Sequence, residues 1–148
     1  MTESFPFCGN FNFLVEIEDL DGGTSSVVGG FSKVSGISSE SDVITYATGN
    51  QSSTVKIPGR SRYGNIRLER GVTSSRDLHD WRQHIEQGQS DVRSGSIVLL
   101  DAAMEEKARW NFYGGWPARY EAPLLDAQDS AISVETLEIA VEKVERVV

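Results

Sequence analysis

Apolar and polar residues alternate with a period of two along most of the chain, the pattern of strands that bury one face. The first such run has its apolar positions at Phe11, Phe13, Val15 and Ile17. Similar alternation predicts strands at residues 66–70, 108–112, 116–120 and 131–144, with a further strand inside residues 27–37. The continuous apolar run at residues 97–100 predicts a strand covered on both faces. Gly114 and Gly115 predict a break between two strands, and a change of apolar phase predicts a bulge near Thr136.

One segment has the period of a helix. Leu78, Trp81 and Ile85 lie at positions i, i+3 and i+7 and therefore share one face. Ser74 is the expected N-cap, with Asp77 three residues later, and Gly88 is the expected residue after the helix. These features predict a helix over about residues 74–87 that packs on one side of a sheet.

Residues 38–57 are too polar to be core, and they contain a β-prone stretch followed by a loop tip at residues 49–53. We expect a hairpin that projects from the body, ended by a turn at Pro58 and Gly59. A projecting hairpin offers unpaired backbone groups and is therefore suited to pairing with another chain. Residues 1–10 are expected to form a flexible arm.

These elements predict a mainly β fold, a two-sheet sandwich or partly closed barrel with one flanking helix. The chain has 148 residues, which is enough for one core, so residues 11–148 are expected to form a single domain.

Charge and cysteine content exclude several classes of protein. The net charge is −8, from 14 basic and 22 acidic residues, which argues against binding nucleic acid through a basic face. The single cysteine, Cys8, excludes an internal disulfide. No apolar run is long enough to span a membrane. The first residues lack the features of a secretory signal peptide, so the chain is expected to be made in the cytoplasm.

No catalytic constellation is evident. His79 and His84 are five residues apart, whereas metal-binding pairs on a helix use a spacing of four, so both are expected to face solvent. Ser75, His79 and Asp80 contain the letters of a hydrolase triad, but no nucleophile elbow is present. We therefore predict a protein that is not an enzyme and has no cofactor or metal. A small hydrolase remains as an alternative.

The tryptophans suggest a second alternative. Trp81, Trp110 and Trp116 could form a platform on which a sugar stacks, as in a carbohydrate-binding β-sandwich. Each lies in phase with an apolar face, however, so membership of the core is favoured for all three.

An ordered series of segments across residues 11–146 resembles the tail-tube proteins of contractile phages and of related phage-tail-like contractile injection systems. The segments that carry the resemblance are residues 30–40, 56–59, 63–72, 77–78, 81–82, 96–101, 108–112, 116–117, 120–121 and 135–140.

The resemblance implies a fold shared with type VI secretion tube proteins, with two sheets and one helix. It also implies that six copies form a ring, in which strands from all subunits join into one inner barrel. Rings stack into a tube inside a contractile sheath, and DNA or protein cargo passes through the lumen. The implied partners are further copies of the chain and the sheath, baseplate and tape-measure proteins. Phage tail, bacteriocin-like particle and injection system remain open.

Under the resemblance, candidate contacts between subunits or rings lie in the arm and in the hairpin. These candidates are Phe5, Phe7, Asp42, Tyr46, Asn50 and Lys56. Arg67 and Glu69, which alternate with Ile66 and Leu68, are candidates for the lumen. The net charge suggests an acidic lumen through which negatively charged cargo slides.

Overall fold

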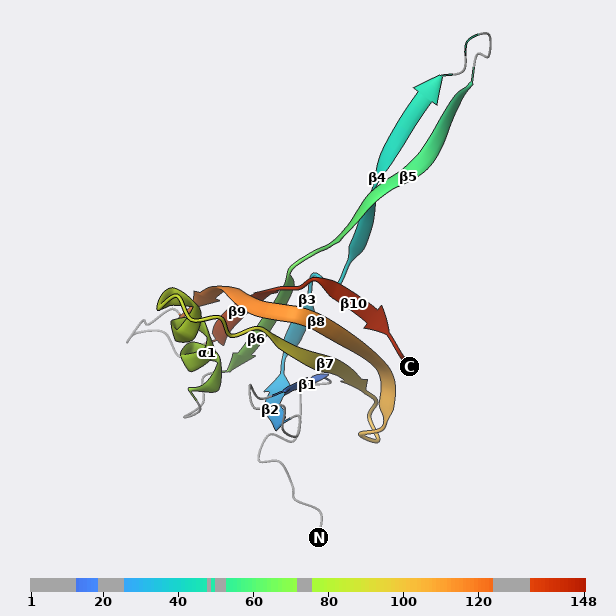
Figure 1. The fold of residues 1–148 in the computed structure, drawn as a ribbon. Coiled ribbons are helices and arrows are strands. Elements are labelled where there is room, and N and C mark those ends of the chain that lie inside the picture. Colours follow the sequence, from blue (N-terminus) through green and yellow to red (C-terminus); the bar gives the residue numbers. More distant parts are fainter. Residues whose placement is uncertain (1–12, 19–25, 48, 50–52, 72–75, 124–133) are drawn as a thin grey trace.

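The computed structural model describes residues 13–18, 26–47, 49, 53–71, 76–123 and 134–148, although the side chains of residues 26–30 and 71 lie outside the description. Its described elements are β1 (Phe13–Ile17), β2 (Ser26–Phe31), β3 (Lys33–Ser35), β4 (Ser39–Ala47), β5 (Thr54–Tyr63), β6 (Ile66–Gly71), α1 (Asp77–Glu86), β7 (Arg93–Leu100), β8 (Glu106–Glu121), β9 (Val134–Ala140) and β10 (Lys143–Arg146). Figure 1 shows a curled body of strands from which one hairpin projects. The prediction of a mainly β chain with one helix is confirmed for this part of the chain.

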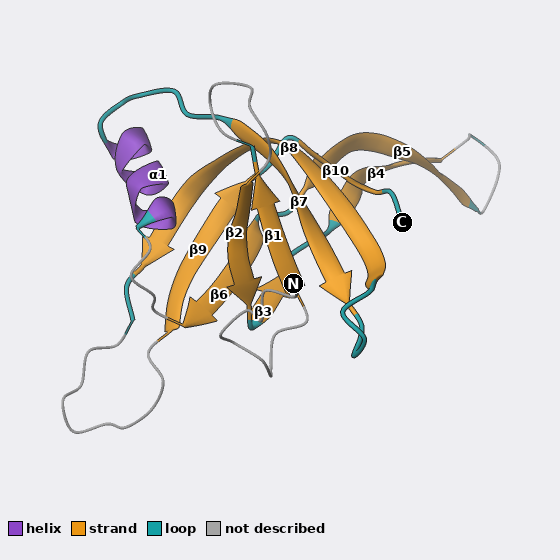
Figure 2. Cartoon of the chain, turned by 90° about the horizontal axis from the view of Figure 1, so that it is seen from below, coloured by secondary structure: helices purple, strands orange, loops and turns teal. Residues whose placement is uncertain are grey.

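The body is an eight-stranded antiparallel sheet in the order β2-β1-β7-β8-β9-β6-β3, with β10 paired to β8. β2 and β3 stand at opposite ends of this order, yet only Ser32 separates them in the chain. The sheet must therefore curl back on itself, as Figure 2 shows, with the Ser32 N–H donating to the Glu69 carbonyl at 3.0 Å. Among the described strands, no pairing between β2 and β3 closes this curl into a barrel. One strand was expected in residues 27–37, but this segment contains two strands, β2 and β3, which form the two opposite edges of the sheet.

The core fills the inside of this curl. Cross-strand register places Ile66 opposite Ile139 and Leu68 opposite Leu137, and all four side chains are at most 1% exposed. α1 adds Leu78 and Trp81 to the same cluster. The cluster also contains Val15, Ile17, Phe31, Ile97 and Phe112.

The helix begins later than expected. Its first residue is Asp77, and Arg76 occupies the N-cap position without a side-chain hydrogen bond. The prediction of Ser74 as N-cap is therefore wrong, and Ser74 itself lies outside the described residues. Gly88 has a φ of +79°, a left-handed conformation suited to glycine just after a helix, as predicted.

β8 is one continuous strand, so the predicted break at Gly114 and Gly115 is wrong. Its first half pairs with β7 and β10, and its second half pairs with β9. Gly114 has a φ of +64°, and a Cβ on Gly115 would lie 2.8 Å from the Phe112 ring. The two glycines therefore bend the strand without ending it, because they permit this backbone and this close packing.

The final strand also differs from the prediction. β6 and β9 keep an unbroken register through Thr136, so the bulge expected there is wrong. The interruption falls at Val141 and Glu142, between β9 and β10. β10 then pairs with β8, while β9 pairs with both β6 and the far half of β8.

β4 and β5 form a separate two-stranded sheet, the projecting hairpin. It is longer than predicted, because β5 continues through Pro58 and Gly59 to Tyr63. The register places Ser41 opposite Ser61 but Val43 opposite Pro58, so Asp42 alone faces Gly59 and Arg60. The expected turn is therefore a bulge inside a strand. A Cβ on Gly59 would lie 3.1 Å from the Asp42 carbonyl oxygen, which explains the glycine.

Candidate assembly surfaces

The hairpin carries an exposed apolar face. Ile44 pairs with Ile57 and Tyr46 pairs with Val55, and a spacing of two places both pairs on the same side. We call these four side chains the hairpin apolar face. Their exposed fractions are 49% for Ile44, 41% for Ile57, 46% for Tyr46 and 37% for Val55. Their own chain therefore leaves this face largely uncovered.

The half of the hairpin nearest the body is held by polar contacts. Arg62 Nε donates to Glu40 Oε1 at 2.6 Å, and its guanidinium lies 3.1 Å from Asp42. The hydrogen bond that Arg62 donates to Glu40, and the charges of the Asp42 and Glu40 carboxylates, raise the pKa of Arg62 above its ordinary value. Across the strands, the Ser41 and Ser61 hydroxyls are 2.7 Å apart. These contacts tie the two strands together where they leave the body.

The structure places three of the six contact candidates. Asp42, Tyr46 and Lys56 are all exposed on the hairpin. Tyr46 belongs to the hairpin apolar face, whereas Lys56 pairs with Thr45 on the opposite side. Phe5, Phe7 and Asn50 lie outside the described residues.

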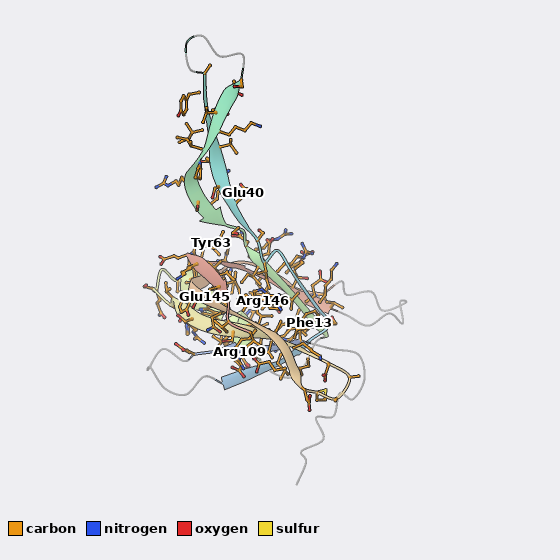
Figure 3. All side chains as sticks on the ribbon, turned by 90° about the vertical axis from the view of Figure 1, so that its right-hand side faces the viewer. Phe13, Glu40, Tyr63, Arg109, Glu145 and Arg146 are labelled. Atoms are coloured by element: carbon orange, nitrogen blue, oxygen red, sulfur yellow. The ribbon has the colours of Figure 1, made fainter. Side chains whose placement is uncertain are left out.

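A small hollow lies where the hairpin joins the body. Its volume is about 230 Å³, and it is lined by Ile37, Ser38, Ser39, Tyr63, Trp110, Val144 and Arg146. We call it the base hollow. The Arg146 guanidinium lies 5.6 Å from the centre of the Trp110 ring, and Figure 3 shows Tyr63 at the foot of the hairpin near Arg146. Sequence analysis missed this hollow because its lining comes from segments that are far apart in the chain.

Arg67 and Glu69 lie on the outward face of β6, opposite the buried Ile66 and Leu68, and Arg67 Nε donates to Glu69 Oε1 at 3.2 Å. Register places Lys33 beside Glu69, and Glu138 beside both Arg67 and Arg119. On β6 and its neighbours β3, β9 and the second half of β8, the charged residues of this face are Lys33, Arg67 and Arg119 with Glu69, Glu121 and Glu138. Positive and negative charges are equal in this described set, so it gives no support to a lumen lined by excess acid.

The tryptophans do not form one platform. Trp81 is 1% exposed, and its Nε1–H donates to the Asp91 carbonyl at 2.8 Å, so its predicted place in the core is confirmed. Trp110 is half-buried at the base hollow. Trp116 is 40% exposed, so its predicted burial is wrong. After the bend at Gly114, Pro117 instead of Trp116 takes the inward position.

His84 does not simply face solvent, as had been expected. Its Nδ1 lies 2.7 Å from Oδ2 of Asp91, a residue that is 1% exposed. Arg93 donates to both Asp91 oxygens, at 2.8 Å and 3.0 Å. Burial by itself would raise the pKa of Asp91, but these hydrogen bonds and charges outweigh it and lower the pKa. The cluster fixes the connection between α1 and β7.

His79 is half-exposed and stacks edge to face on Tyr120, with ring centres 5.6 Å apart. Its Nδ1 is 3.6 Å from Asp80, and Ser75 lies outside the described residues. Within the described part of the chain, no group of three or more His, Cys, Asp or Glu side chains is arranged to hold a metal ion.

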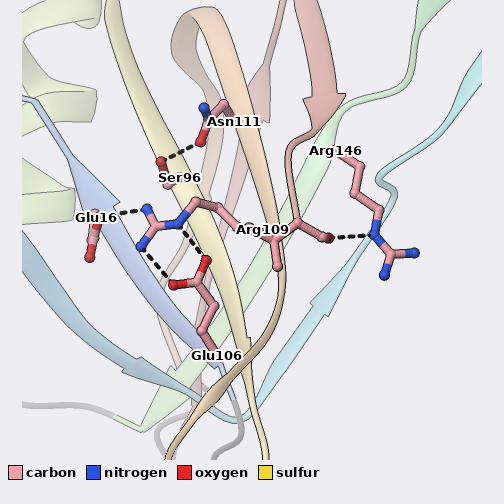
Figure 4. Close-up of polar contacts among 7 residues, drawn as sticks. Glu16, Ser96, Glu106, Arg109, Asn111 and Arg146 are labelled. Atoms are coloured by element: carbon pink, nitrogen blue, oxygen red, sulfur yellow. Dashed lines mark hydrogen bonds and ion pairs between the residues drawn. The ribbon is translucent and has the colours of Figure 1, made fainter.

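Ion pairs tie the strands of the body together. Figure 4 shows Arg109 of β8 donating to Glu16 of β1 at 3.0 Å and to Glu106 at 2.7 Å. These hydrogen bonds hold the pKa of Arg109 above its ordinary value. A buried pair, Arg70 with Glu135, joins β6 to β9, and the Tyr120 hydroxyl donates to the same carboxylate at 2.8 Å. The body is therefore held by ion pairs between its strands as well as by its apolar core.

The family comparison decides the class of protein. The family model described as T4-like virus tail tube protein gp19 matches residues 9–145, nearly the whole chain. The chain belongs to the tail tube protein family. The resemblance seen in the sequence is thereby confirmed, and the carbohydrate-binding alternative is not favoured.

Solved structures agree with this membership. A chain of the PVC sheath-tube complex, from an extracellular contractile injection system in the extended state, matches with a TM-score of 0.79 at 26% identity, covering 98% of this chain and 93% of that chain. A chain of the anti-feeding prophage baseplate, 6-fold symmetrised, matches with a TM-score of 0.82 at 20% identity, covering 97% of each chain. Hcp1 from Flavobacterium johnsoniae shares the fold more distantly, with a TM-score of 0.52 at 17% identity over 90% of this chain and 94% of that chain.

No curated protein matches the chain significantly in sequence. Among the described helices, none is long and apolar enough to cross a membrane.

Proposed function

We propose that this tail tube protein forms hexameric rings that stack into the hollow inner tube of a contractile tail or injection particle. Sheath, baseplate and tape-measure proteins are its partners, and DNA or protein cargo passes through the lumen when the sheath contracts. Its work is mechanical, and no residue acts as a catalyst. The sheath-tube and baseplate complexes in which similar chains occur support these partners.

The single observation that carries this proposal is the exposure of the hairpin. Every residue of β4 is exposed, including Val43 at 63%, although the strand contains a well-formed apolar face. An exposed apolar face rimmed by polar residues is typical of a surface to which another protein binds. A second copy of the chain, as a tube requires, supplies that partner.

The edges of the body support the same reading. Within the described strands, β2 pairs with β1 and β3 pairs with β6, and each leaves its other edge without a strand partner. Exposed edges invite pairing with another chain, and a closed ring of strands removes them. Joining subunits edge to edge would form the shared inner barrel of a hexamer.

At residue level, we assign Asp42, Tyr46 and Lys56 to contacts between rings, with Phe5, Phe7 and Asn50 as further contacts. Arg67 and Glu69 are assigned to the lumen. On this assignment the described lining near β6 is charge-balanced, because Arg67 is paired with Glu69 and Arg119 with Glu121.

The test compares the full chain with a hairpin-truncated variant in which residues 42–60 are replaced by Asn-Gly, a two-residue hairpin turn between the paired Ser41 and Ser61. Both proteins are examined by negative-stain electron microscopy and by mass in solution, with and without an assembling baseplate. We expect rings and stacked tubes from the full chain. The truncated chain should keep a folded body, seen as a cooperative urea transition, but should not stack.

A full chain that remains monomeric and does not join rings on an assembling baseplate would overturn the proposal. Tubes of normal length from the truncated variant would contradict the role of the hairpin while leaving the tube assignment intact.

A further inference from the structure

Two features of the molecule remain unfilled within a single chain. One is the hairpin apolar face, whose four side chains are between 37% and 49% exposed. The other is the base hollow of about 230 Å³, which is lined by both apolar and polar side chains. The hairpin apolar face is a set of projecting side chains, whereas the base hollow is a recess.

A chain cannot bring its own hairpin apolar face to its own base hollow. Ile44 lies five residues beyond Ser39, which lines the hollow, and an extended strand therefore separates the two by roughly 17 Å. Figure 1 shows the hairpin running straight away from the body. Contact between the two features consequently requires two copies of the chain.

The base hollow suits a protein side chain better than a small-molecule ligand. Ligand pockets usually enclose about 300–1,000 Å³, and this hollow is smaller. Its walls include the Trp110 indole and the Tyr63 ring, which favour an aromatic or branched apolar side chain. Tyr46, in the hairpin apolar face, is a side chain of this type and reaches outward from an exposed strand.

Charge supports the same match. Arg146 is exposed at the hollow, where its guanidinium lies over Trp110 and its Nε donates to the Val148 oxygen at 2.7 Å. Alternation along β4 places Glu40 and Asp42 on the same side as Ile44 and Tyr46. On the neighbouring strand β5, Arg62 is the basic residue that lies on this side in regular register, where it pairs with both carboxylates. Of the hairpin's other basic residues, Lys56 faces the opposite side and Arg60 lies in the bulge. The hairpin apolar face thus continues into an excess of negative charge, which complements Arg146.

We propose that the hairpin apolar face of one copy docks into the base hollow of the next copy, with Tyr46 entering beside Trp110 and Asp42 near Arg146. This inference rests on the proposed function and names the surfaces that join successive subunits. The two surfaces differ and lie at opposite ends of the hairpin, so the contact is heterologous and each docked copy offers a free hollow to another. Such a contact propagates along a tube.

The direct test is a disulfide between two chains, both in a Cys8→Ser background. One chain carries Tyr46→Cys and the other carries Ser38→Cys at the hollow, so a bond between them is necessarily intermolecular. The matched control replaces Tyr46→Cys by Thr45→Cys, which lies on the opposite side of the same strand. After mild oxidation of assembled tubes, we expect a cross-linked dimer from the Tyr46→Cys mixture, at least about tenfold more abundant than from the Thr45→Cys mixture, because a disulfide requires Cα atoms within about 7 Å.

A second test does not depend on disulfide geometry. Tyr46→Glu places a charge in the contact and Ser38→Trp fills the hollow, and each should raise the critical concentration for tube growth by about tenfold or more. Thr45→Glu, the matched control, adds the same charge on the opposite side of the strand beside Lys56, and should raise the critical concentration much less than Tyr46→Glu does.

The outcomes separate this inference from the proposed function. Tubes that form normally with Tyr46→Glu, or that cross-link equally through Thr45→Cys and Tyr46→Cys, would overturn the docking while the tube assignment stands. A full chain that does not enter rings even on a baseplate would remove both.

Discussion

The body and the hairpin are built from the same alternation of side chains, and they differ in what covers it. In β6, Ile66 and Leu68 are at most 1% exposed. In β4, Ile44 and Tyr46 have the same spacing but are 49% and 46% exposed. A period of two therefore shows that a strand has an apolar face, but it does not show whether the same chain or another chain covers that face.

The ion pairs of the body and of the hairpin differ in burial in the same way as the apolar side chains do. The Arg70 and Glu135 side chains are 4% and 8% exposed, whereas those of Arg62 and Glu40 are 61% and 67% exposed. The two pairs join the same chemical groups across neighbouring antiparallel strands. Only in the body does the pair stand in a low-dielectric environment, where the loss of one partner is costly.

The largest loss of stability is expected when the buried ion pair between Arg70 and Glu135 is broken. Glu135→Gln removes the carboxylate that neutralises Arg70, and should lower the free energy of unfolding of the monomer by about 3–5 kcal/mol. Urea denaturation followed by far-UV circular dichroism measures this change. Glu40→Gln, the same substitution in the hairpin, should have little effect because surface ion pairs contribute little. Equal losses for both variants would contradict the contrast.

The next effect concerns the apolar faces. Ile66→Ala should lower the free energy of unfolding by about 2–5 kcal/mol, because it removes buried methylene groups and leaves a cavity beside Ile139. The same urea denaturation experiment measures this loss. The mass in solution checks that the variant is monomeric, and far-UV circular dichroism checks that it is folded. A loss below about 1 kcal/mol would mean that the curl of the sheet collapses around the site, and that the core is less tightly packed than its burial indicates.

A smaller effect is expected at Asp91, which links α1 to β7. Asp91→Asn should cost about 1–3 kcal/mol near neutral pH, because Arg93 and His84 lose a charged acceptor. The pKa of Asp91 is lower in the folded chain than its ordinary value of 3.8, so its stabilisation is present above that value and is lost as pH falls through the folded pKa. The difference in unfolding free energy between the two proteins should therefore shrink in acid. A constant difference down to the acid transition would show that the charge of Asp91 is not what stabilises the connection.

The smallest effect on the monomer is expected at the hairpin. Ile44→Ala, the counterpart of Ile66→Ala, should change the free energy of unfolding by at most about 0.5 kcal/mol, because its side chain is already largely in water. The same variant should weaken tube growth, measured by light scattering at increasing protein concentration. Strong destabilisation of the monomer by Ile44→Ala would show that the hairpin belongs to the fold of its own chain, and would reverse the comparison.

Much of this fold could be predicted from local patterns. Alternation at Val15 and Ile17, and at Ile66 and Leu68, correctly identified strands and their buried faces. The helical spacing of Leu78 and Trp81 likewise identified the helix and its buried side. The polarity of residues 38–57 indicated a segment outside the core, and the described residues of that range are all exposed. These properties follow from backbone geometry that repeats every few residues, and they are therefore present in the order of the residues.

Other features depended on how distant segments meet. Gly114 and Gly115 bend β8 without ending it because β7, β10 and β9 continue the pairing on either side. That bend, absent from any local pattern, exposes Trp116 and buries Pro117.

The amino-acid sequence by itself determined the classes of element, their apolar faces and the family to which the chain belongs, because these rest on local spacing and on an ordered series of motifs. Only the tertiary structure decided that Asp91 holds His84 and Arg93, and that Trp110, Tyr63 and Arg146 meet at one hollow. The physical reason is that Trp110, Tyr63 and Arg146 lie far apart in the chain, and that Asp91 meets His84 only where the end of α1 packs beside the start of β7. Their positions follow from sheet register and curl, which depend on the packing of the whole body.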